Sequence, residues 1–414
     1  MKATMIGGGM TAFGKHIDRN LKSMVEEAVT IALKDAGIEK DEIDAAYVGN
    51  ASQGVLQGQE SVRGQVVLHA MGIGGIPIVN LENACASSAT ALNGAMAMIN
   101  AGEIECALVL GMEKMYFEDN AIVQRAFTGS MDVEVLEETV RRMKESEAKA
   151  RAEVEAGNNE PKKEKSGQKT VFMDLYGMAA RAHMEKYGTT QRQLAAIASK
   201  NHWHSSMNPY AQYQKDYSIE EVLASPDVAY PLTRLMCSPI GDGAAAAIVC
   251  SPEFARKKAA ANKVEIASCV LGSARVTGDR SQSNLTLLVK KAYDQASVGP
   301  EDIHLAEVHD ATAMGEISSS EGLMLCDPGE GGPFAEAGHS KLGGKLPINV
   351  SGGLECQGHP IGATGVRQVV ELFWHLTDRA GKRQVEGAKV GLAQNAGGST
   401  PAGEGALSVT IMKR

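Results

Sequence analysis

The segment ALKDAGIEKDEIDAAYVGNA, residues 32–51, has a counterpart in AYDQASVGPEDIHLAEVHDA, residues 292–311. Each segment is typical of the end of a helix, a turn with an acidic pair, and a strand that leads to a polar tip. The two align without a gap and are identical at the pairs Ala32/Ala292, Ala36/Ala296, Ile43/Ile303, Ala46/Ala306, Val48/Val308 and Ala51/Ala311. This alignment predicts that one structural unit occurs twice in the chain.

The repeat continues beyond these segments. Val79-Asn80, shortly before Cys85, corresponds to Ile348-Asn349, before a loop that carries His359. In each half a helix follows the loop, and an apolar strand follows the helix, at 106–110 and at 390–393. Chance similarity between two βαβ units is the alternative, and the matching order of three successive elements makes it the weaker account.

The chain is therefore predicted to form two similar α/β halves, residues 1–255 and 262–414. Fused repeats usually pack about a pseudo-twofold axis, so that the polar loops between strands and helices converge on one site. This arrangement would bring Cys85 and His359 together despite their separation in sequence.

A long insertion, about 116–234, interrupts the first half. Its charge-dense part, 131–168, is predicted to begin as a helix stabilised by charge pairs and to break at Gly157-Asn158-Asn159-Glu160-Pro161 into a solvated, Lys-rich loop. Two further helices are predicted at 171–187 and 190–202. The first carries a stripe of Met and aromatic residues, which suits a core and could also form the wall of a pocket for a flexible acyl group.

Composition excludes several classes of protein. The chain has 414 residues, 43% of them hydrophobic and 22% charged, as in globular proteins, and its net charge of −9 argues against a nucleic-acid or anionic-membrane surface. It shows no bilayer-spanning run and no signal-peptide pattern. The seven cysteines are scattered and lack metal-ligand spacing, so we expect a reducing, cytoplasmic setting and no bound metal. Cys106 and Cys250, and by the same pattern Cys269, are expected in the core.

Cys85 lies in the stretch Asn83-Ala84-Cys85-Ala86-Ser87, between an apolar run at 76–81 and a small-residue helix at 87–100. The run is predicted to be a buried strand. A cysteine at the start of a helix feels the positive end of the helix dipole, which should lower its pKa and make the thiolate available. A buried structural cysteine is the alternative, and it weakens if the partners of a cysteine nucleophile occur elsewhere in the chain.

Three further polar loops are predicted where strands end. They are 308–312, with His309; 352–365, which reads GGLECQGHPIGATG and contains His359; and 393–398, which reads AQNAGG. A lone histidine is more often structural. His359 is different because the following proline, the flanking glycines and the helix after it fix its backbone.

Over nearly its whole length the chain resembles the thiolases, and among them the sterol-carrier-protein-type branch. The motifs that carry the resemblance are Asn-Ala-Cys-Ala-Ser at 83–87, His-Asp-Ala at 309–311, Gly-His-Pro-Ile-Gly-Ala-Thr-Gly at 358–365, Cys-Ser-Pro with Gly-Asp-Gly-Ala at 237–244, and a Gly-Gly turn near the C-terminus. The resemblance implies two βαβαβαββ halves in a five-layered α-β-α-β-α sandwich, with a loop-domain insertion in the first half. It also implies a homodimer that acts on coenzyme A thioesters and holds no permanent cofactor.

The resemblance also implies roles for single residues. Cys85 is expected to be the acylated nucleophile and His359 the base that takes its proton. His309 stands where most thiolases have an asparagine that helps to bind the thioester oxygen of the second substrate. Gly398 and the backbone N–H of Cys85 are expected to form the second oxyanion hole.

The sequence departs from the thiolase pattern at one catalytic position. Most thiolases carry a second cysteine in a Cys-x-Gly turn, but here the turn reads Asn395-Ala396-Gly397; and Ala311 follows His-Asp, where some relatives have a cysteine. The nearest remaining candidate for the second acid/base is Cys356. The alternative is that Cys356 packs beneath the loop and His359 acts alone.

These features predict thiolytic cleavage of a 3-oxoacyl-CoA, or the reverse Claisen condensation. One alternative is a specialised thiolase or acyltransferase that acts on a bulky or aromatic 3-oxoacyl substrate together with a small zinc-ribbon/OB-fold protein. Another is a non-catalytic acyl-CoA or lipid carrier of the same fold. A retro-aldolase is disfavoured, because such relatives lack the nucleophile that Cys85 supplies. The residues that contact coenzyme A are not assigned; Lys200 and Arg192 are candidates, with a solvated surface as the alternative.

Overall fold

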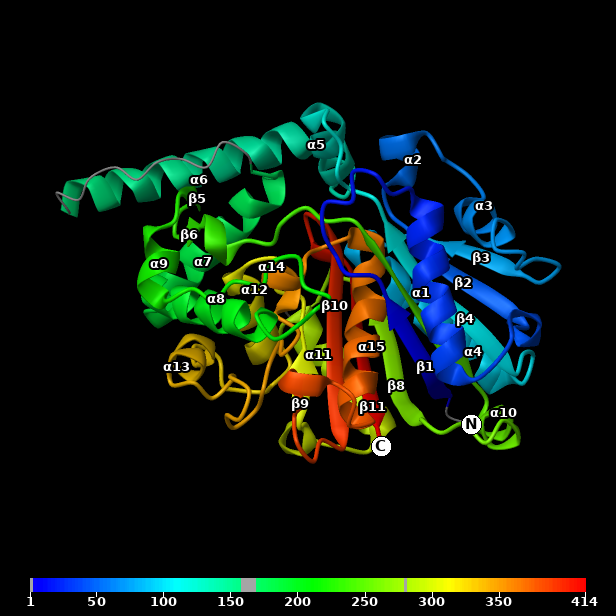
Figure 1. The fold of residues 1–414 in the computed structure, drawn as a ribbon. Coiled ribbons are helices and arrows are strands. Elements are labelled where there is room, and N and C mark those ends of the chain that lie inside the picture. The colour runs from blue at the N-terminus through cyan, green and yellow to red at the C-terminus, as the bar shows by residue number, and fades with distance from the viewer. Residues whose placement is uncertain (1–2, 158–168, 279–280) are drawn as a thin grey trace.

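A computed structural model describes residues 3–157, 169–278 and 281–414 (Figure 1). Its main sheet is mixed and has nine strands. In spatial order the strands are β3 (Ile78–Leu81), β2 (Ala45–Gly49), β4 (Cys106–Glu113), β7 (Gly243–Cys250), β1 (Thr4–Met10), β8 (Val264–Gly272), β11 (Gly403–Lys413), β10 (Val390–Thr400) and β9 (Leu305–Glu307). The strands β5 (Asp227–Ala229) and β6 (Leu232–Thr233) form a separate hairpin.

The sheet consists of two equivalent halves. They meet where β1 pairs with β8 through only two residue pairs, Thr4 with Glu265 and Met5 with Val264. Outward from this joint, the first half runs β1-β7-β4-β2-β3, and the second runs β8-β11-β10-β9 and then an isolated parallel bridge between Ala306 and Ile348. The predicted internal repeat is confirmed, since the same strand order occurs on both sides of the joint.

The repeat holds down to single backbone hydrogen bonds. The N–H of Ala46 donates to the carbonyl oxygen of Pro77 at 2.9 Å, and the N–H of Ala306 donates to that of Pro347 at 3.0 Å. Ile78 and Ile348 are therefore equivalent, because they pair with Ala46 and Ala306 respectively. The predicted match of Val79-Asn80 with Ile348-Asn349 was one residue out of register.

The strand β3 is partly exposed, whereas the sequence predicted a buried strand there. It is the last strand of the first half, so its outer edge has no neighbour in the described chain. Val79 is 39% exposed. An apolar run alone does not distinguish an edge strand from a central one.

Five layers follow from the alternation of side chains along the strands. In β4, Cys106 and Leu108 face the outer helix α1 (Leu21–Ala36), while Ala107 and Val109 face the inside. The second half repeats this: its outer face packs on α11 (Asn284–Ala296), and its inner face packs on the same central core. The central layer consists of α4 (Ser87–Ala101) and α15 (Thr364–Leu376), which confirms the predicted α-β-α-β-α sandwich.

The two central helices start side by side. A side chain at Gly365 would place its Cβ 2.5 Å from the backbone nitrogen of Ala89, so only glycine permits this approach. The Ser88 hydroxyl accepts a hydrogen bond from the N–H of Val366 at 3.1 Å. The loops that precede α4 and α15 are thereby brought to the same place.

The insertion lies between β4 and β7 and covers one end of the sandwich (Figure 1). Its helices are α5 (Asn120–Thr128), α6 (Leu136–Gly157), α7 (Val171–Tyr187), α8 (Gln191–Ser205) and α9 (Ile219–Ala224). The predicted charge-paired helix is confirmed, with Arg141 bonded to Glu138 at 2.7 Å and Glu145 at 2.8 Å. Most of the predicted break and the Lys-rich run lie outside the described residues. The helix α8 is longer than predicted, and a capping box at Thr190 starts it.

Short helices complete the chain. They are α2 (Gln53–Gln57), α3 (Arg63–His69), α10 (Pro252–Lys257), α12 (Ala313–Gly322), α13 (Gly331–Glu336) and α14 (Gly353–Gln357), with 3-10 turns at Lys40–Glu42, Ala84–Ala86, Pro300–Asp302, Arg234–Met236, Ile361–Ala363 and Gly381–Arg383. None of the described helices combines the length and the apolar character needed to cross a bilayer.

Three cysteines and one lysine test the expected burial. Cys106 and Cys250 are fully buried and Cys269 is nearly so, as predicted. Lys200 is also buried and pairs with Glu316, which rules out a solvated surface and leaves it no free charge for a ligand.

Candidate active site

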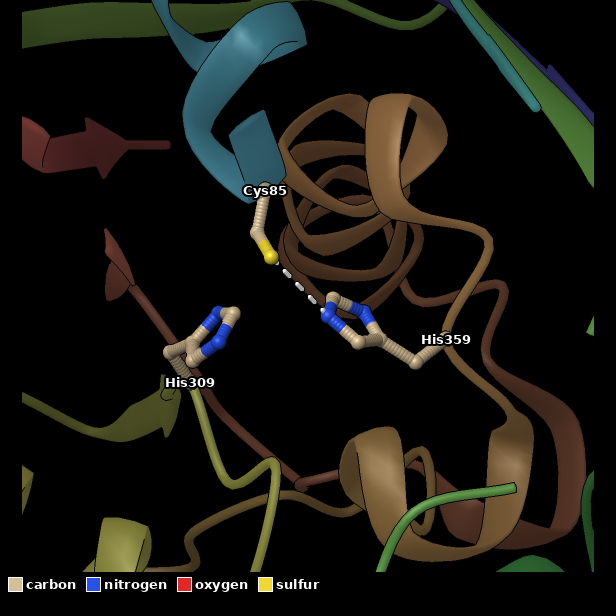
Figure 2. Close-up of side chains that lie close together, drawn as sticks. All are labelled: Cys85, His309 and His359. Atoms are coloured by element: carbon tan, nitrogen blue, oxygen red, sulfur yellow. Dashed lines mark hydrogen bonds between the residues drawn. The ribbon is translucent and has the colours of Figure 1, made fainter. Parts of the chain in front are cut away.

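Cys85, His309 and His359 come together (Figure 2) at a cavity that α7 of the insertion helps to line. Cys85 lies in the 3-10 turn Ala84–Ala86 that leads into α4, His309 follows β9, and His359 precedes α15. The Cys85 Sγ lies 3.2 Å from His359 Nε2. The rings of His309 and His359 meet edge to face with centroids 5.2 Å apart. The predicted convergence of the two halves on one site is thus observed.

The turn around Cys85 is fixed by its small neighbours. The Ser87 hydroxyl donates to the carbonyl oxygen of Ala84 at 2.6 Å and accepts from the N–H of Asn83 at 2.9 Å. Strand β10 passes close behind, where a Cβ on Gly397 would lie 2.1 Å from the oxygen of Asn83 and 3.0 Å from the nitrogen of Cys85. The glycine therefore lets the strand support the turn directly.

The hydrogen bonds of Thr364 determine the tautomer of His359. The Thr364 hydroxyl donates its one hydrogen to the carbonyl oxygen of Pro360 at 3.1 Å. It therefore accepts in its 2.8 Å contact with His359 Nδ1, which must carry the ring hydrogen. This leaves a lone pair on Nε2, the nitrogen that faces Cys85. Burial, reinforced by His309 and Arg367, lowers the pKa of His359 well below its usual value, so the ring is neutral.

The predicted lowering of the Cys85 pKa is wrong. Burial, with smaller contributions from Glu113 and Glu82, raises the pKa of the thiol to about 12. Desolvation and these negative charges outweigh the lowering of the pKa expected from the helix dipole. Cys85 lies in the 3-10 turn, before the first residue of α4. The resting pair is a neutral thiol and a neutral imidazole, so a thiolate forms only when His359 takes the proton.

His309 faces the same site as a neutral ring. Burial lowers its pKa to about 3. Its backbone N–H donates to Gln394 Oε1 at 2.9 Å, which ties the loop to β10. Its buried Nδ1 makes no hydrogen bond of ordinary geometry among the described residues, while a contact with Asn395 opposes the fall in the pKa of the ring. A neutral imidazole can donate one hydrogen bond to an oxygen of a bound molecule.

Gly398 lies in a strand, where the sequence predicted a loop. The segment 393–398 belongs to β10 and pairs with β11, as in Gly397 with Ala406. At Gly398 the backbone turns to φ +67°, and regular pairing resumes at Ser399. The irregularity exposes Gly398 to the cavity in front of Cys85.

Cys356 lies away from this cavity. It is fully buried on α14, beside Ser205, and burial raises the pKa of its thiol well above the usual value. It is absent from the described residues that line the cavity, among which Cys85 carries the only thiol.

A cavity of about 600 Å³ opens in front of Cys85 and the two histidines. Much of its wall is apolar and comes from α7, and the rest includes α5, α11 and β11. The larger apolar residues on its wall include Phe127, Phe172, Met173, Leu175, Met178, Ile240, Leu285, Ile361 and Leu407. The Met-rich helix thus serves as a pocket wall, one of its two predicted roles. A smaller adjoining cavity carries Lys15, Lys169 and Arg234 on its lining.

Glu113 is a site-supporting residue that the sequence did not single out. Its buried carboxylate accepts hydrogen bonds from the backbone of Ala51 at 2.9 Å, Ser52 at 3.1 Å and Gly362 at 3.0 Å, and from Asn50 Nδ2 at 2.8 Å. An acidic residue at the end of an apolar strand was the available signal.

Comparison with known proteins gives matches over most of the chain. The family model "Thiolase, N-terminal domain" matches residues 3–253, and "Thiolase C-terminal domain-like" matches residues 278–406. The chain is 36% identical to an acetyl-CoA acetyltransferase of Methanothermobacter thermautotrophicus, covering 95% of this chain and 96% of the relative. It is also 36% identical to human sterol carrier protein 2, covering 99% of this chain and 71% of the relative.

Solved structures share the fold at low identity. The Ltp2-ChsH2(DUF35) aldolase has a TM-score of 0.74 at 21% identity and covers 100% of this chain and 97% of that chain. Human mitochondrial 3-ketoacyl-CoA thiolase has a TM-score of 0.69 at 17% identity, and the match covers 100% of this chain and 98% of that chain. With the family models matched across both halves and relatives of 36% identity along nearly its full length, this chain belongs to the thiolase family.

Proposed function

We propose that this enzyme cleaves a 3-oxoacyl-CoA with coenzyme A, or catalyses the reverse Claisen condensation, through an acyl group held on Cys85. The observation that carries the proposal is the 3.2 Å contact between the Cys85 thiol and the lone pair of His359 Nε2. Thiolase structures solved with bound coenzyme A support the choice of substrate.

In the cleavage direction His359 acts first as a base. It takes the Cys85 proton as the sulfur attacks the 3-oxo carbon, and the bond between carbons 2 and 3 then breaks. The released electron pair forms the enolate of acetyl-CoA, which takes the proton back from His359 and leaves. The thiol of a second coenzyme A then gives its proton to His359 as its sulfur attacks the acyl-cysteine. The carbon–sulfur bond to Cys85 breaks, and the Cys85 thiolate takes the proton from His359, which restores the resting pair.

Two groups of donors are placed for the oxygens that become negative in these steps. His309 is neutral, and its ring lies beside His359, so it can donate to the thioester oxygen of the enolate. The N–H groups of Cys85 and Gly398 are the proposed donors to the oxygen of the tetrahedral intermediate. One such donor typically contributes about 3–4 kcal/mol to barrier lowering.

The second proton transfer is assigned to the histidines and not to Cys356. The burial of Cys356 beneath the loop supports the alternative that it packs there and does not contact substrate. The variant Cys356→Ala should keep carbon–carbon bond activity within a few fold. A complete loss of activity in a folded Cys356→Ala protein would instead support Cys356 as the second acid/base.

A second candidate is a specialised enzyme for a bulky or aromatic acyl group that works with a small zinc-ribbon/OB-fold protein. The size and apolar lining of the 600 Å³ cavity favour a group larger than acetyl. The solved Ltp2-ChsH2(DUF35) aldolase is named for two proteins. This supports the proposal that a chain of this fold works together with a second protein. The exposed edge strand β3 leaves room for a second copy, and we propose a cytoplasmic homodimer.

The acyl-enzyme can be tested directly by mass spectrometry. After incubation with acetyl-CoA and with longer acyl-CoAs, Cys85 should carry the matching acyl group, and added coenzyme A should remove it. The variant Cys85→Ser should show no such removable acyl group. Rates with acetoacetyl-CoA and with an aromatic 3-oxoacyl-CoA separate the two candidates. Tight binding of every acyl-CoA without any adduct would favour a non-catalytic carrier.

A further inference from the structure

The three side chains at the site also form a ligand set for a metal ion. One ligand atom each from Cys85, His309 and His359 lie within 4.8 Å of one another (Figure 2). Zinc bonds of about 2.3 Å to sulfur and 2.0–2.1 Å to nitrogen would place such atoms about 3.3–3.6 Å apart in a tetrahedral site. The 3.2 Å between Cys85 Sγ and His359 Nε2 is already close to that spacing. A modest approach of His309 completes the triangle.

Both histidines have nitrogens suited to ligation. The lone pair of His359 Nε2 faces the sulfur, and Nδ1–H is held by Thr364. A metal-bound histidine commonly donates its other ring N–H to such an acceptor, which fixes the ring. His309 places one ring nitrogen within 4.8 Å of both other ligand atoms, and Asn395 is near enough to hydrogen-bond with the ring.

The nature of the ligands indicates the metal. One thiolate and two imidazoles suit Zn²⁺, whereas Mg²⁺ and Ca²⁺ prefer oxygen ligands. Three protein ligands leave a fourth position, and the 600 Å³ cavity provides room there for water.

We propose that the enzyme, when it carries no acyl group, binds one Zn²⁺ ion through Cys85, His309 and His359, and that the ion reversibly closes the site. On binding, the thiol releases its proton to solvent, one Zn–S and two Zn–N bonds form, and nothing is oxidised or reduced. The bound sulfur is then protected from alkylation and from acylation. The sequence could not reveal this site, because its ligands come from three separate loops without metal-ligand spacing.

Titration with ZnCl₂ alone tests the proposal without an activity assay. Chelator-treated full-length protein should bind one equivalent, and Co²⁺ in its place should give a sulfur-to-cobalt charge-transfer band. Cys85→Ser and His309→Ala should each weaken zinc binding by at least about 10-fold, the range seen when metal-site support is lost. Zinc should slow alkylation of Cys85 by iodoacetamide, and chelator should restore the rate.

Two cysteines serve as matched controls. Cys237, which lines the smaller adjoining cavity, and the partly exposed Cys326 offer thiols outside the proposed ligand set. The variants Cys237→Ser and Cys326→Ser should bind zinc as the parent protein does. Zinc binding that survives both Cys85→Ser and His309→Ala, or that disappears in either control, would overturn the proposal. The outcome is independent of the proposed thiolase reaction, since only metal binding and thiol protection are measured.

Discussion

Thr364 determines which nitrogen of His359 faces Cys85, although it touches neither the sulfur nor the cavity. Its hydroxyl accepts from Nδ1 only because its own hydrogen is committed to Pro360. In Thr364→Val this acceptor is lost, and the ring is free to turn an N–H toward the sulfur. We expect alkylation of Cys85 and turnover to fall about 10- to 100-fold, part of the contribution of a general base.

Thr364→Ser provides the control for this prediction. Serine keeps the hydroxyl and should restore most of the alkylation rate, whereas a purely structural role for the threonine methyl would leave the serine variant impaired. Equal alkylation rates in Thr364→Val and the parent protein would show that the tautomer is set by other contacts.

Gly397 allows β10 to pass directly behind the nucleophile turn. An added Cβ would overlap the oxygen of Asn83 at 2.1 Å, so Gly397→Ala must displace the turn that holds Cys85. Overpacking of this kind typically costs about 1–3 kcal/mol. We expect an unfolding free energy lower by that amount, measured in urea, and slower acylation of Cys85. Gly14→Ala is the control, because its nearest neighbours lie 3.9 Å away; equal effects in the two variants would contradict the steric account.

At the scale of elements, Glu113 joins the end of β4 to loops from both halves of the chain. It binds the segment after β2 and, through Gly362, the turn before α15. Burial raises its pKa from 4.5 to about 7, against the hydrogen bonds that favour the charged form. Between these pH values the folded protein holds a proton that the unfolded chain has released. The contribution of the protonated Glu113 side chain to the free energy of unfolding is therefore complete below about pH 4.5 and is lost as pH rises through about 7.

The variant Glu113→Gln isolates this effect. Unfolding in urea at several pH values should show the parent protein losing stability relative to the variant between about pH 4.5 and 7, by on the order of 3 kcal/mol. A stability difference that does not change with pH would contradict the assignment.

Elements whose signals are local were predicted well from the sequence. The paired segments 32–51 and 292–311 each fold as a helix end, a 3-10 turn and a strand, and the last helical residues, Ala36 and Ala296, are equivalent. The failures concern long-range structure. The segment 393–398 becomes a strand only because β11 pairs with it, and β3 is exposed because it lies at the sheet edge. The pKa of Cys85 was mispredicted because the burial that decides it comes from distant segments.

At the scale of the whole molecule, buried charges join the insertion to the second half. Lys200 on α8 pairs with Glu316 on α12 and donates to the oxygen of Ile348 at 2.9 Å. The neighbouring Asn201 Nδ2 lies within 3.2 Å of carboxylate oxygens of Asp310, Glu316 and Glu355. Burial raises the pKa of Asp310 and of Glu355 well above their usual values. One cation and several acids thus connect the insertion to the loops that carry both histidines.

Removal of Lys200 should therefore weaken the protein as a unit. In Lys200→Met, Glu316 is left buried without its cation, a change that typically costs about 3–5 kcal/mol. Arg192→Ala removes only exposed ion pairs with Glu220 and Glu336, and should cost less than about 1 kcal/mol. Hydrogen exchange should show α8, α12 and α14 losing protection together in Lys200→Met, because one network holds all three. Lys200→Met combined with Glu316→Leu should recover part of the lost stability. If exchange increased in α8 alone, or if Lys200→Met cost no more than Arg192→Ala, the insertion and the second half would have to be held together by their apolar contacts and not by these charges.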